Sequence, residues 1–200
     1  MVFSKAQKIV LASGNPGKIR EIQEIMSSHP IVPQSQFDIS EADETGTTFV
    51  ENAIIKARHA ALHSGLPAIA DDSGLVVDAL DGAPGVKSAR YAGAGATDQQ
   101  NLMKLLDDLK GVPEAQRTAR FICIIVLMMH QDDPCPVIAE GVWEGRILEQ
   151  SVGENGFGYD PVFWVPEKGC ASAELDAEIK NNLSHRGQAL TELMSNLKKK

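Results

Sequence analysis

The chain has 200 residues, a formal net charge of −8, 43% hydrophobic and 23% charged residues. These are ordinary values for a globular protein, and the length suits one large domain or two closely joined lobes with a real core. The acidic balance excludes a general nucleic-acid binder but not a nucleotide substrate, because a few lysines in one pocket can hold phosphates. The longest apolar run, residues 121–129, is too short to span a bilayer, and three cysteines without C-x-x-C spacing favour a reducing cytoplasm.

A glycine-rich loop lies near the start of the chain. Residues 8–12 are predicted to form a buried strand, and isoleucines at helical spacing begin at Ile19. Between them stand Ser13, Gly14, Asn15, Pro16, Gly17 and Lys18. Such loops let backbone N–H groups approach a phosphate, and Lys18 could reach the anion. A plain strand–helix turn is the alternative, since the loop lacks the Walker A pattern.

A helix with acidic residues ahead of it follows. Residues 48–51 have a capping-box pattern, and the helix is predicted to run to about His63. Lys56 lies on the same side of this helix as Asn52. Asp43 and Glu44, just before the helix, are possible Mg²⁺ ligands. They could equally be acids that favour a helix N-terminus.

The most distinctive stretch is Asp71-Asp72-Ser73-Gly74, between apolar runs at 67–70 and 75–77. We expect one strand to end and another to begin here. Because side chains alternate on extended backbone, Asp71 and Asp72 should do different jobs. One of them, facing a cleft, would suit Mg²⁺. The alternative is a turn in which these side chains bond their own backbone.

The middle of the chain is predicted to be structural. Residues 97–100 cap a helix that Gly111 ends. Residues 118–129 form a long strand that is covered on both faces, and strands at 136–143 and 146–150 come next.

Two later motifs suggest a base-binding site. Glycines flank Phe157, which leaves its ring able to stack on a base, and Asp160 could accept hydrogen bonds from a base edge or a lysine. A glycine-rich hairpin with a packed Phe157 is the alternative. Helical regions are predicted at 171–183 and 187–197. Lys180, His185 and Arg186 gather at the break and offer donors to a phosphate or a base carbonyl.

Together these motifs fit a nucleotide held with Mg²⁺ and hydrolysed by an activated water. A non-catalytic nucleotide-binding regulator would use the same groove without turnover. A kinase or a phosphohydrolase that releases orthophosphate is a further alternative, although the absent Walker A loop argues against a P-loop kinase.

The sequence also resembles the inosine/xanthosine triphosphate pyrophosphatase family, which hydrolyses non-canonical purine nucleotides. The resemblance covers residues 8–197 and rests on motifs in the family's order. They are Ser13–Lys18, Thr48–Ala53, Ala70–Leu75, Gly82–Gly85, Ser88–Tyr91, Phe157–Pro161 and Ser184–Gly187.

The resemblance implies hydrolysis of dITP, ITP and XTP to the monophosphate and pyrophosphate, with Mg²⁺, in a cytoplasmic homodimer. It implies a single α/β domain over residues 1–200, with an elongated mixed central sheet flanked by helices. This domain would have two lobes, with the nucleotide cleft between them. Asp72 would be the general base and a metal ligand, with Asp43 at a second metal position. The family often has Glu-Glu where this chain has Asp43-Glu44, which leaves open which acid reaches the metal.

The remaining assignments by resemblance divide between the two ends of the nucleotide. The phosphate side comprises Ser13, Gly14, Asn15, Pro16, Gly17, Lys18, Lys56 and Ser73. The base and sugar side comprises Phe157, Gly158, Tyr159, Asp160, Lys180, His185 and Arg186.

Overall fold

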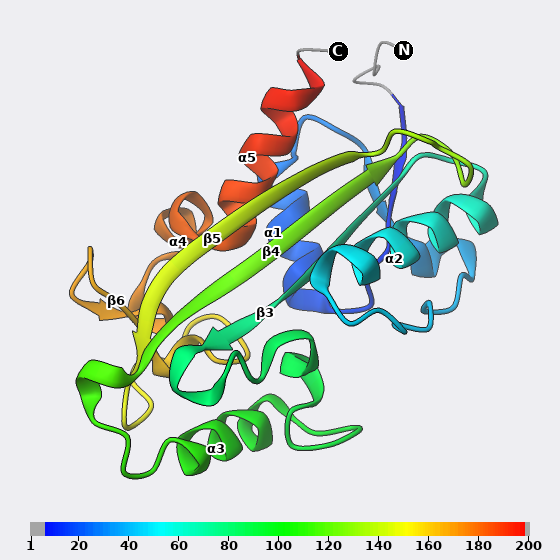
Figure 1. Cartoon of the computed structure of the whole chain (residues 1–200). Coiled ribbons are helices and arrows are strands. Elements are labelled where there is room, and N and C mark those ends of the chain that lie inside the picture. Colours follow the sequence, from blue (N-terminus) through cyan, green and yellow to red (C-terminus); the bar gives the residue numbers. More distant parts are fainter. Residues whose placement is uncertain (1–6, 199–200) are drawn as a thin grey trace. The chain divides into compact units, whose positions relative to one another are not determined.

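A computed structural model describes residues 7–198, and Figure 1 shows its helices and strands. The helices are α1 Pro16–Ile25, α2 Phe49–Ser64, α3 Asp98–Asp108, α4 Ala177–Leu183 and α5 His185–Leu197. The strands are β1 Ile9–Leu11, β2 Ile31–Pro33, β3 Ala68–Val77, β4 Thr118–Met128, β5 Val137–Ile147, β6 Phe163–Val165 and β7 Cys170–Ala171. No helix in this part of the chain is long and apolar enough to cross a membrane.

Within residues 7–198, the strands form one seven-stranded sheet in the order β2-β1-β3-β4-β5-β6-β7. Strand β1 is parallel to β2 and β3, whereas β6 is antiparallel to β5 and β7. The sheet is therefore mixed, and the predicted α/β class with a mixed sheet flanked by helices is confirmed.

The chain divides into two compact units. Unit 1 comprises the residues up to Asp72, Cys123–Gly141 and the residues from Arg186 onward, and unit 2 comprises Ser73–Ile122 and Val142–His185. Each unit has its own hydrophobic core. The prediction of a nucleotide cleft between two lobes of a single domain stays a prediction.

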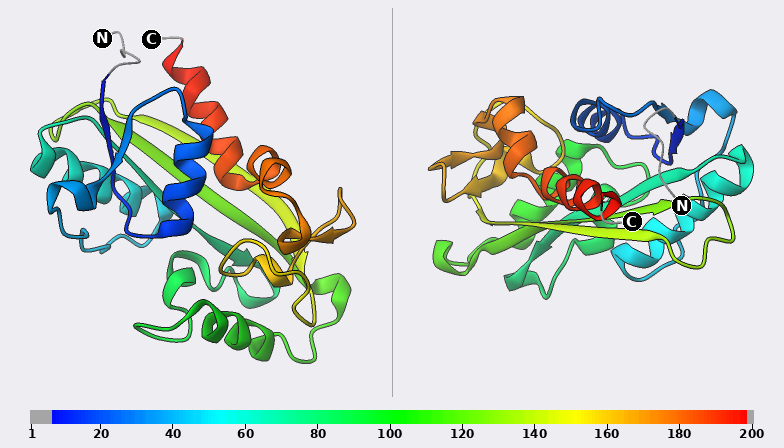
Figure 2. Two further views of the ribbon diagram at one scale, coloured as in Figure 1. Left: turned by 180° about the vertical axis from the view of Figure 1, so that it is seen from behind. Right: turned by 90° about the horizontal axis from the view of Figure 1, so that it is seen from above.

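In unit 1, helices cover both faces of the strands. Figure 2 shows α1 and α5 on one face and α2 on the other. Because side chains alternate along a strand, Cys123, Ile125 and Leu127 of β4 pack with α1 and α5, and the residues between them point to the face that α2 covers. Helix α2 buries mainly small side chains there, namely Ala53, Ala57, Ala60 and Ala61.

Local sequence signals determine where α2 begins and ends. The Thr48 hydroxyl accepts a hydrogen bond from the Glu51 N–H, and the Glu51 carboxylate accepts one from the Thr48 N–H. The helix ends at Gly65, whose φ of 66° is a left-handed conformation that favours glycine. The predicted capping box and helix are confirmed.

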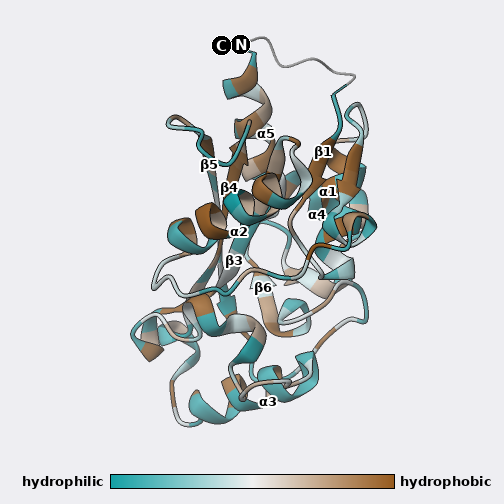
Figure 3. Ribbon diagram, turned by 90° about the vertical axis from the view of Figure 1, so that its right-hand side faces the viewer, coloured by the Kyte–Doolittle hydropathy of each residue, from teal (hydrophilic) through white to brown (hydrophobic). Residues whose placement is uncertain are grey.

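The core of unit 2 is built on aromatic side chains. Phe163 lies with its ring centroid 4.6 Å from that of Phe121 and 5.2 Å from that of Trp143. Helix α3 adds Leu102 and Leu105 to the same core, and Figure 3 shows hydrophilic residues along much of its surface. The predicted capped helix at this place is confirmed.

Three predicted element boundaries are wrong. Strand β3 runs unbroken through Asp71-Asp72-Ser73-Gly74, where one strand was expected to end and another to begin. Both carboxylates are compensated within the fold, Asp71 by Lys18 and Arg186 and Asp72 by Lys56. The strands expected at 136–143 and 146–150 are the single strand β5. Residues 171–176, expected to be helical, hold the end of β7 and a short 3₁₀ turn.

We expect the stability of unit 1 to depend on the buried side chains of α5. Leu190 is fully buried, so Leu190→Ala should lower the free energy of unfolding by about 2–5 kcal/mol. Leu62 of α2 is 54% exposed, and Leu62→Ala should change it by about 0.5 kcal/mol or less. Urea unfolding of the two variants makes the comparison, and equal losses would contradict the described packing.

Candidate active site

The loop after β1 is shaped by its own side chains. The Asn15 Oδ1 accepts hydrogen bonds from the N–H groups of Gly17 at 2.9 Å and Lys18 at 3.1 Å, which caps α1. The Ser13 hydroxyl accepts the Asn15 N–H at 3.2 Å, and Pro16 is the first residue of the helix. A Cβ at Gly14 would lie 2.2 Å from Glu41 Oε1, at the end of an exposed side chain that would have to move. The loop thus presents Lys18 from the first turn of α1.

Asp71 is a buried anchor for two cations. Only 1% of its surface is exposed, and its Oδ2 lies 3.2 Å from Lys18 Nζ and 3.0 Å from Arg186 Nη2. Arg186 also pairs with Glu21 of α1. Burial acts to raise the pKa of Asp71, but Lys18 and Arg186 outweigh it and hold the pKa well below its usual range. The carboxylate therefore stays ionised and connects α1, β3 and α5.

Asp72 has a different set of partners. Its Oδ1 accepts a hydrogen bond from Lys56 Nζ at 2.8 Å, and its Oδ2 accepts one from Asn52 Nδ2 at 3.4 Å. Burial raises the pKa of Asp72 above its ordinary value, although Lys56 acts against this shift. Burial lowers the pKa of Lys56, but Asp72, Asp71 and Glu44 together raise it above the usual value, so the ammonium stays charged. The expectation that the two aspartates do different jobs agrees with these contacts.

Of the two acids ahead of α2, Glu44 is the one beside Lys56. Its Oε1 lies 3.0 Å from Lys56 Nζ, whereas Asp43 is exposed. Glu44 and Asp72 thus flank the same ammonium group. Within residues 7–198, no group of three or more His, Cys, Asp or Glu side chains could hold a metal by itself. Two carboxylates nevertheless suit Mg²⁺, which often binds one or two of them and completes its shell with water and substrate phosphates.

In unit 2, Asp160 organises the loop that carries Phe157. The carboxylate is 4% exposed and accepts three hydrogen bonds, from the Phe157 N–H at 2.9 Å, Lys180 Nζ at 2.7 Å and the Ser172 hydroxyl at 2.9 Å. A side chain at Gly156 would lie 2.1 Å from Asp160 Oδ2. Of the two roles predicted for Asp160, the structure shows the contact with a neighbouring lysine.

The Phe157 ring is half-buried beneath a cation. Lys180 Nζ lies 5.1 Å from the ring centroid. The next residue, Gly158, has a φ of +62° and donates its N–H to Asp98 Oδ2 at 2.9 Å. The Tyr159 hydroxyl is buried and donates to the Ser88 carbonyl oxygen at 2.8 Å. These contacts fix the loop on both sides of the ring.

His185 and Ser73 also belong to unit 2. The His185 imidazole is 7% exposed and stacks on Phe121, with ring centroids 4.8 Å apart and planes inclined by 12°. Ser73 is half-buried on β3. The structure thus groups Lys18, Lys56, Asp72 and Arg186 in unit 1, and Phe157, Asp160, Lys180 and His185 in unit 2.

The sequence interpretation missed four residues of these groups. Asp71 was noted but given no partner, and Asn52 was placed beside Lys56 without a role. Asp98 and Ser172 had no signal, because they contact the Phe157 loop from distant segments. Only the fold reveals such contacts.

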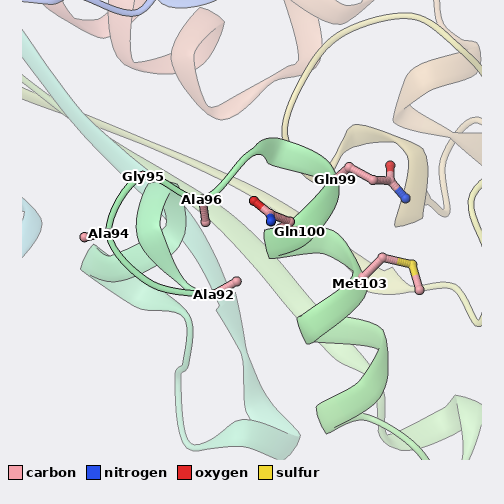
Figure 4. A pocket seen from close by; sticks show the side chains of 7 residues that line it. All are labelled: Ala92, Ala94, Gly95, Ala96, Gln99, Gln100 and Met103. Carbon is pink, nitrogen blue, oxygen red and sulfur yellow. The ribbon is translucent and has the colours of Figure 1, made fainter.

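A surface pocket beside α3 does not fit a nucleotide. Its volume is about 480 Å³, and it is lined by Ala92, Ala94, Gly95, Ala96, Gln99, Gln100 and Met103 (Figure 4). None of these seven side chains is charged, so the pocket lacks the cations that a triphosphate requires.

A mixed α/β fold with a capped loop that presents a lysine, paired acids around a second lysine and a glycine-framed aromatic has the features of a nucleotide-binding protein. Comparison with known proteins agrees. The sequence model of the Ham1 family matches residues 9–196. The chain belongs to this family, and the family resemblance predicted from its motifs is confirmed.

Similar proteins cover nearly the whole chain. A protein of Vibrio parahaemolyticus named dITP/XTP pyrophosphatase is 62% identical over 193 residues, which is 96% of each chain. One of the same name from Photobacterium profundum is also 62% identical, over 96% of this chain and 98% of its own length. The solved structure of a HAM1 protein from Coxiella burnetii has a TM-score of 0.89 and 52% identity, and covers 97% of this chain and all of that one. The Staphylococcus aureus Ham1 protein has a TM-score of 0.85 and 40% identity, over 96% of this chain and 98% of that one.

We expect Asp71 to be essential for stability. Asp71→Asn leaves the Arg186 charge buried with less compensation and should cost about 3–5 kcal/mol of unfolding free energy. Asp78 pairs with Arg120 at 2.8 Å on the surface, and Asp78→Asn should cost about 0.2–1 kcal/mol. Chemical denaturation measures both variants. Equal, small losses would show that the Asp71 pairs do not support the fold.

Proposed function

We propose that this chain is a nucleoside triphosphate pyrophosphatase that hydrolyses dITP, ITP and XTP to the monophosphate and pyrophosphate, and so clears non-canonical purines from the nucleotide pool. The single observation that carries the proposal is the buried Asp72, hydrogen-bonded to Lys56, which Glu44 also contacts. The similar bacterial proteins are named dITP/XTP pyrophosphatase, which supports dITP and XTP as substrates.

The chain's own cations would bind the phosphates. Lys18 at the start of α1 and Lys56 on α2 are held by Asp71 and Asp72, so their ammonium groups are placed before substrate arrives. Backbone N–H groups of the loop Ser13–Gly17 and the hydroxyl of Ser73 would add hydrogen bonds to phosphate oxygens. Preorganised donors of this kind stabilise the charge that develops on a pyrophosphate leaving group.

Asp72 would act as the general base. Its raised pKa makes its carboxylate a stronger base than an ordinary aspartate, and Lys56 and Asn52 fix its orientation. We propose that Asp72 orients and deprotonates a water for in-line attack at the α-phosphorus.

Mg²⁺ is the expected cofactor. Asp72 and Glu44 would hold the ion, which would neutralise charge on the triphosphate. The family resemblance predicted Asp43 at the second metal position, but Glu44 is the acid beside Lys56 and Asp43 is exposed. The fit of two carboxylates beside the proposed phosphate-binding lysine supports this assignment.

The group in unit 2 would recognise the purine. Phe157 would stack on the base, and Gly158, Tyr159, Asp160 and Lys180 would shape its surroundings. A 6-oxo group accepts a hydrogen bond from a donor such as His185. Arg186, the other donor predicted from the family resemblance, is paired with Asp71 and Glu21 in unit 1. A 6-amino group leaves buried donors unpaired, at a cost of about 1–3 kcal/mol for each one. The predicted homodimer and cytoplasmic location rest on the family resemblance.

Turnover of ITP and ATP, measured side by side, tests the proposal. With Mg²⁺ present, we expect ITP to give pyrophosphate, ATP to react far more slowly, and both reactions to stop on addition of a chelator. Pyrophosphate and orthophosphate are assayed separately, because the two products distinguish attack at the α-phosphorus from attack at the γ-phosphorus.

Two results would contradict the proposal. Release of orthophosphate from ITP would rule out attack at the α-phosphorus. Binding of ITP without turnover would favour a nucleotide-binding regulator.

Replacement of Asp72 tests the general base. Asp72→Asn keeps the shape but loses the basic carboxylate, so kcat should fall by about 10²–10⁴-fold. Asp132, in an exposed turn, provides the control, and Asp132→Asn should leave kcat unchanged. Near-normal turnover by Asp72→Asn, measured as pyrophosphate release, would remove Asp72 from this role.

A further inference from the structure

We propose that Asp98, in the first turn of α3, is a positioning residue that holds the Phe157 ring in place for the base. The inference rests on the proposed function, in which Phe157 stacks on the purine. Asp98 lies outside the motifs that carry the family resemblance, on a helix that the sequence assigned a purely structural role.

The two peptide units that flank the Phe157 Cα are each fixed by a carboxylate. The Phe157 N–H donates to Asp160 Oδ2 at 2.9 Å, and the Gly158 N–H donates to Asp98 Oδ2 at 2.9 Å. Because the backbone has two soft dihedrals per residue, fixing the peptide planes before and after Phe157 sets the direction in which its side chain leaves the chain. Without Asp98, the second plane would keep only the 3.3 Å hydrogen bond that the Phe157 carbonyl oxygen accepts from the Asp160 N–H. Gly158, with a φ of +62° and no side chain, would then allow that plane to rotate.

Asp98 is itself held on a rigid element. Thr97 caps α3 through reciprocal hydrogen bonds with Gln100, and Leu102 and Leu105 are buried in the core of unit 2. A carboxylate in the first turn also interacts favourably with the helix dipole. The acceptor for Gly158 therefore stands on a fixed support, whereas the loop that it holds contains several glycines.

Because Asp98 is exposed, its replacement can change the Phe157 loop without destabilising the fold. Asp98 and its hydrogen bond to Gly158 lie at the surface, unlike the buried contacts of Asp160. Losing Asp98 should therefore loosen the loop without opening the core. Stacking accepts every base, because each has a π-face, so the loss should weaken binding of ITP and XTP by similar factors and leave the phosphate chemistry intact.

Steady-state kinetics with ITP and XTP test the inference. Asp98→Ala should raise KM for both substrates about fivefold and change kcat by less than about twofold, within the range that stacking energies allow. Asp98→Asn retains an acceptor for the Gly158 N–H and should restore most of the loss. Asp107→Ala is the matched control, because it removes an exposed carboxylate of the same helix that pairs with Lys110 and not with the loop. It should leave KM unchanged.

A double-mutant cycle with Phe157→Ala completes the test. Phe157→Ala alone should raise KM about tenfold, and adding Asp98→Ala should raise it no further, because both act through one ring. Additive effects, or an equal KM increase in Asp107→Ala, would overturn the role of Asp98. If Phe157→Ala leaves KM unchanged, the proposed base contact itself fails. If only Asp98→Ala leaves KM unchanged, the base contact stands and the inference about Asp98 fails.

Discussion

The buried Asp71 carboxylate is the interaction on which unit 1 depends. It lies in β3 and receives Lys18 from the first turn of α1 and Arg186 from the first turn of α5, which are 168 positions apart in the numbering of the chain (186 − 18). Removing charges from water is costly, and mutual attraction offsets that cost only where the contacts are good. Each of these groups is therefore tolerated in the interior because the others are present, and the pairing fixes how the three segments meet.

The neighbouring aspartate shows what the same residue type does in another environment. Asp71 faces two cations that keep its pKa low, whereas burial raises the pKa of Asp72 despite Lys56. Adjacent residues on a strand point to opposite faces, so one step along the backbone separates an anchor with a lowered pKa from a carboxylate with a raised pKa. In unit 2, Asp160 repeats the anchoring role by receiving Lys180 and Ser172. In both units, an aspartate places a lysine that the proposed function uses.

Helices and strands were predicted correctly from the sequence where the signal lay within a few neighbouring residues. The capping boxes at Thr48 and Thr97 and the apolar run of β4 are patterns within a few residues, and each defined its element. The prediction of a strand break at Asp71-Asp72 was wrong, because two adjacent charges indicate a solvated segment unless their partners are known. These partners, Lys18, Lys56 and Arg186, come from distant segments of the chain. The contact of Asp98 with Gly158 and the choice of Glu44 beside Lys56 likewise depend on tertiary placement.

The two halves of the proposed recognition differ in what they demand of the fold. A stacking ring adds affinity for any base, so Phe157 needs only to be held in an accessible position. Hydrogen bonds at the surface are enough to hold it there. Discrimination between a 6-oxo and a 6-amino group needs a donor that cannot turn away, since a mobile donor would find water instead. His185 meets this demand, because its ring lies flat on Phe121, which itself packs on Phe163 in the core of unit 2. Selectivity for the base would then be a property of that aromatic core as much as of the residue that touches the substrate.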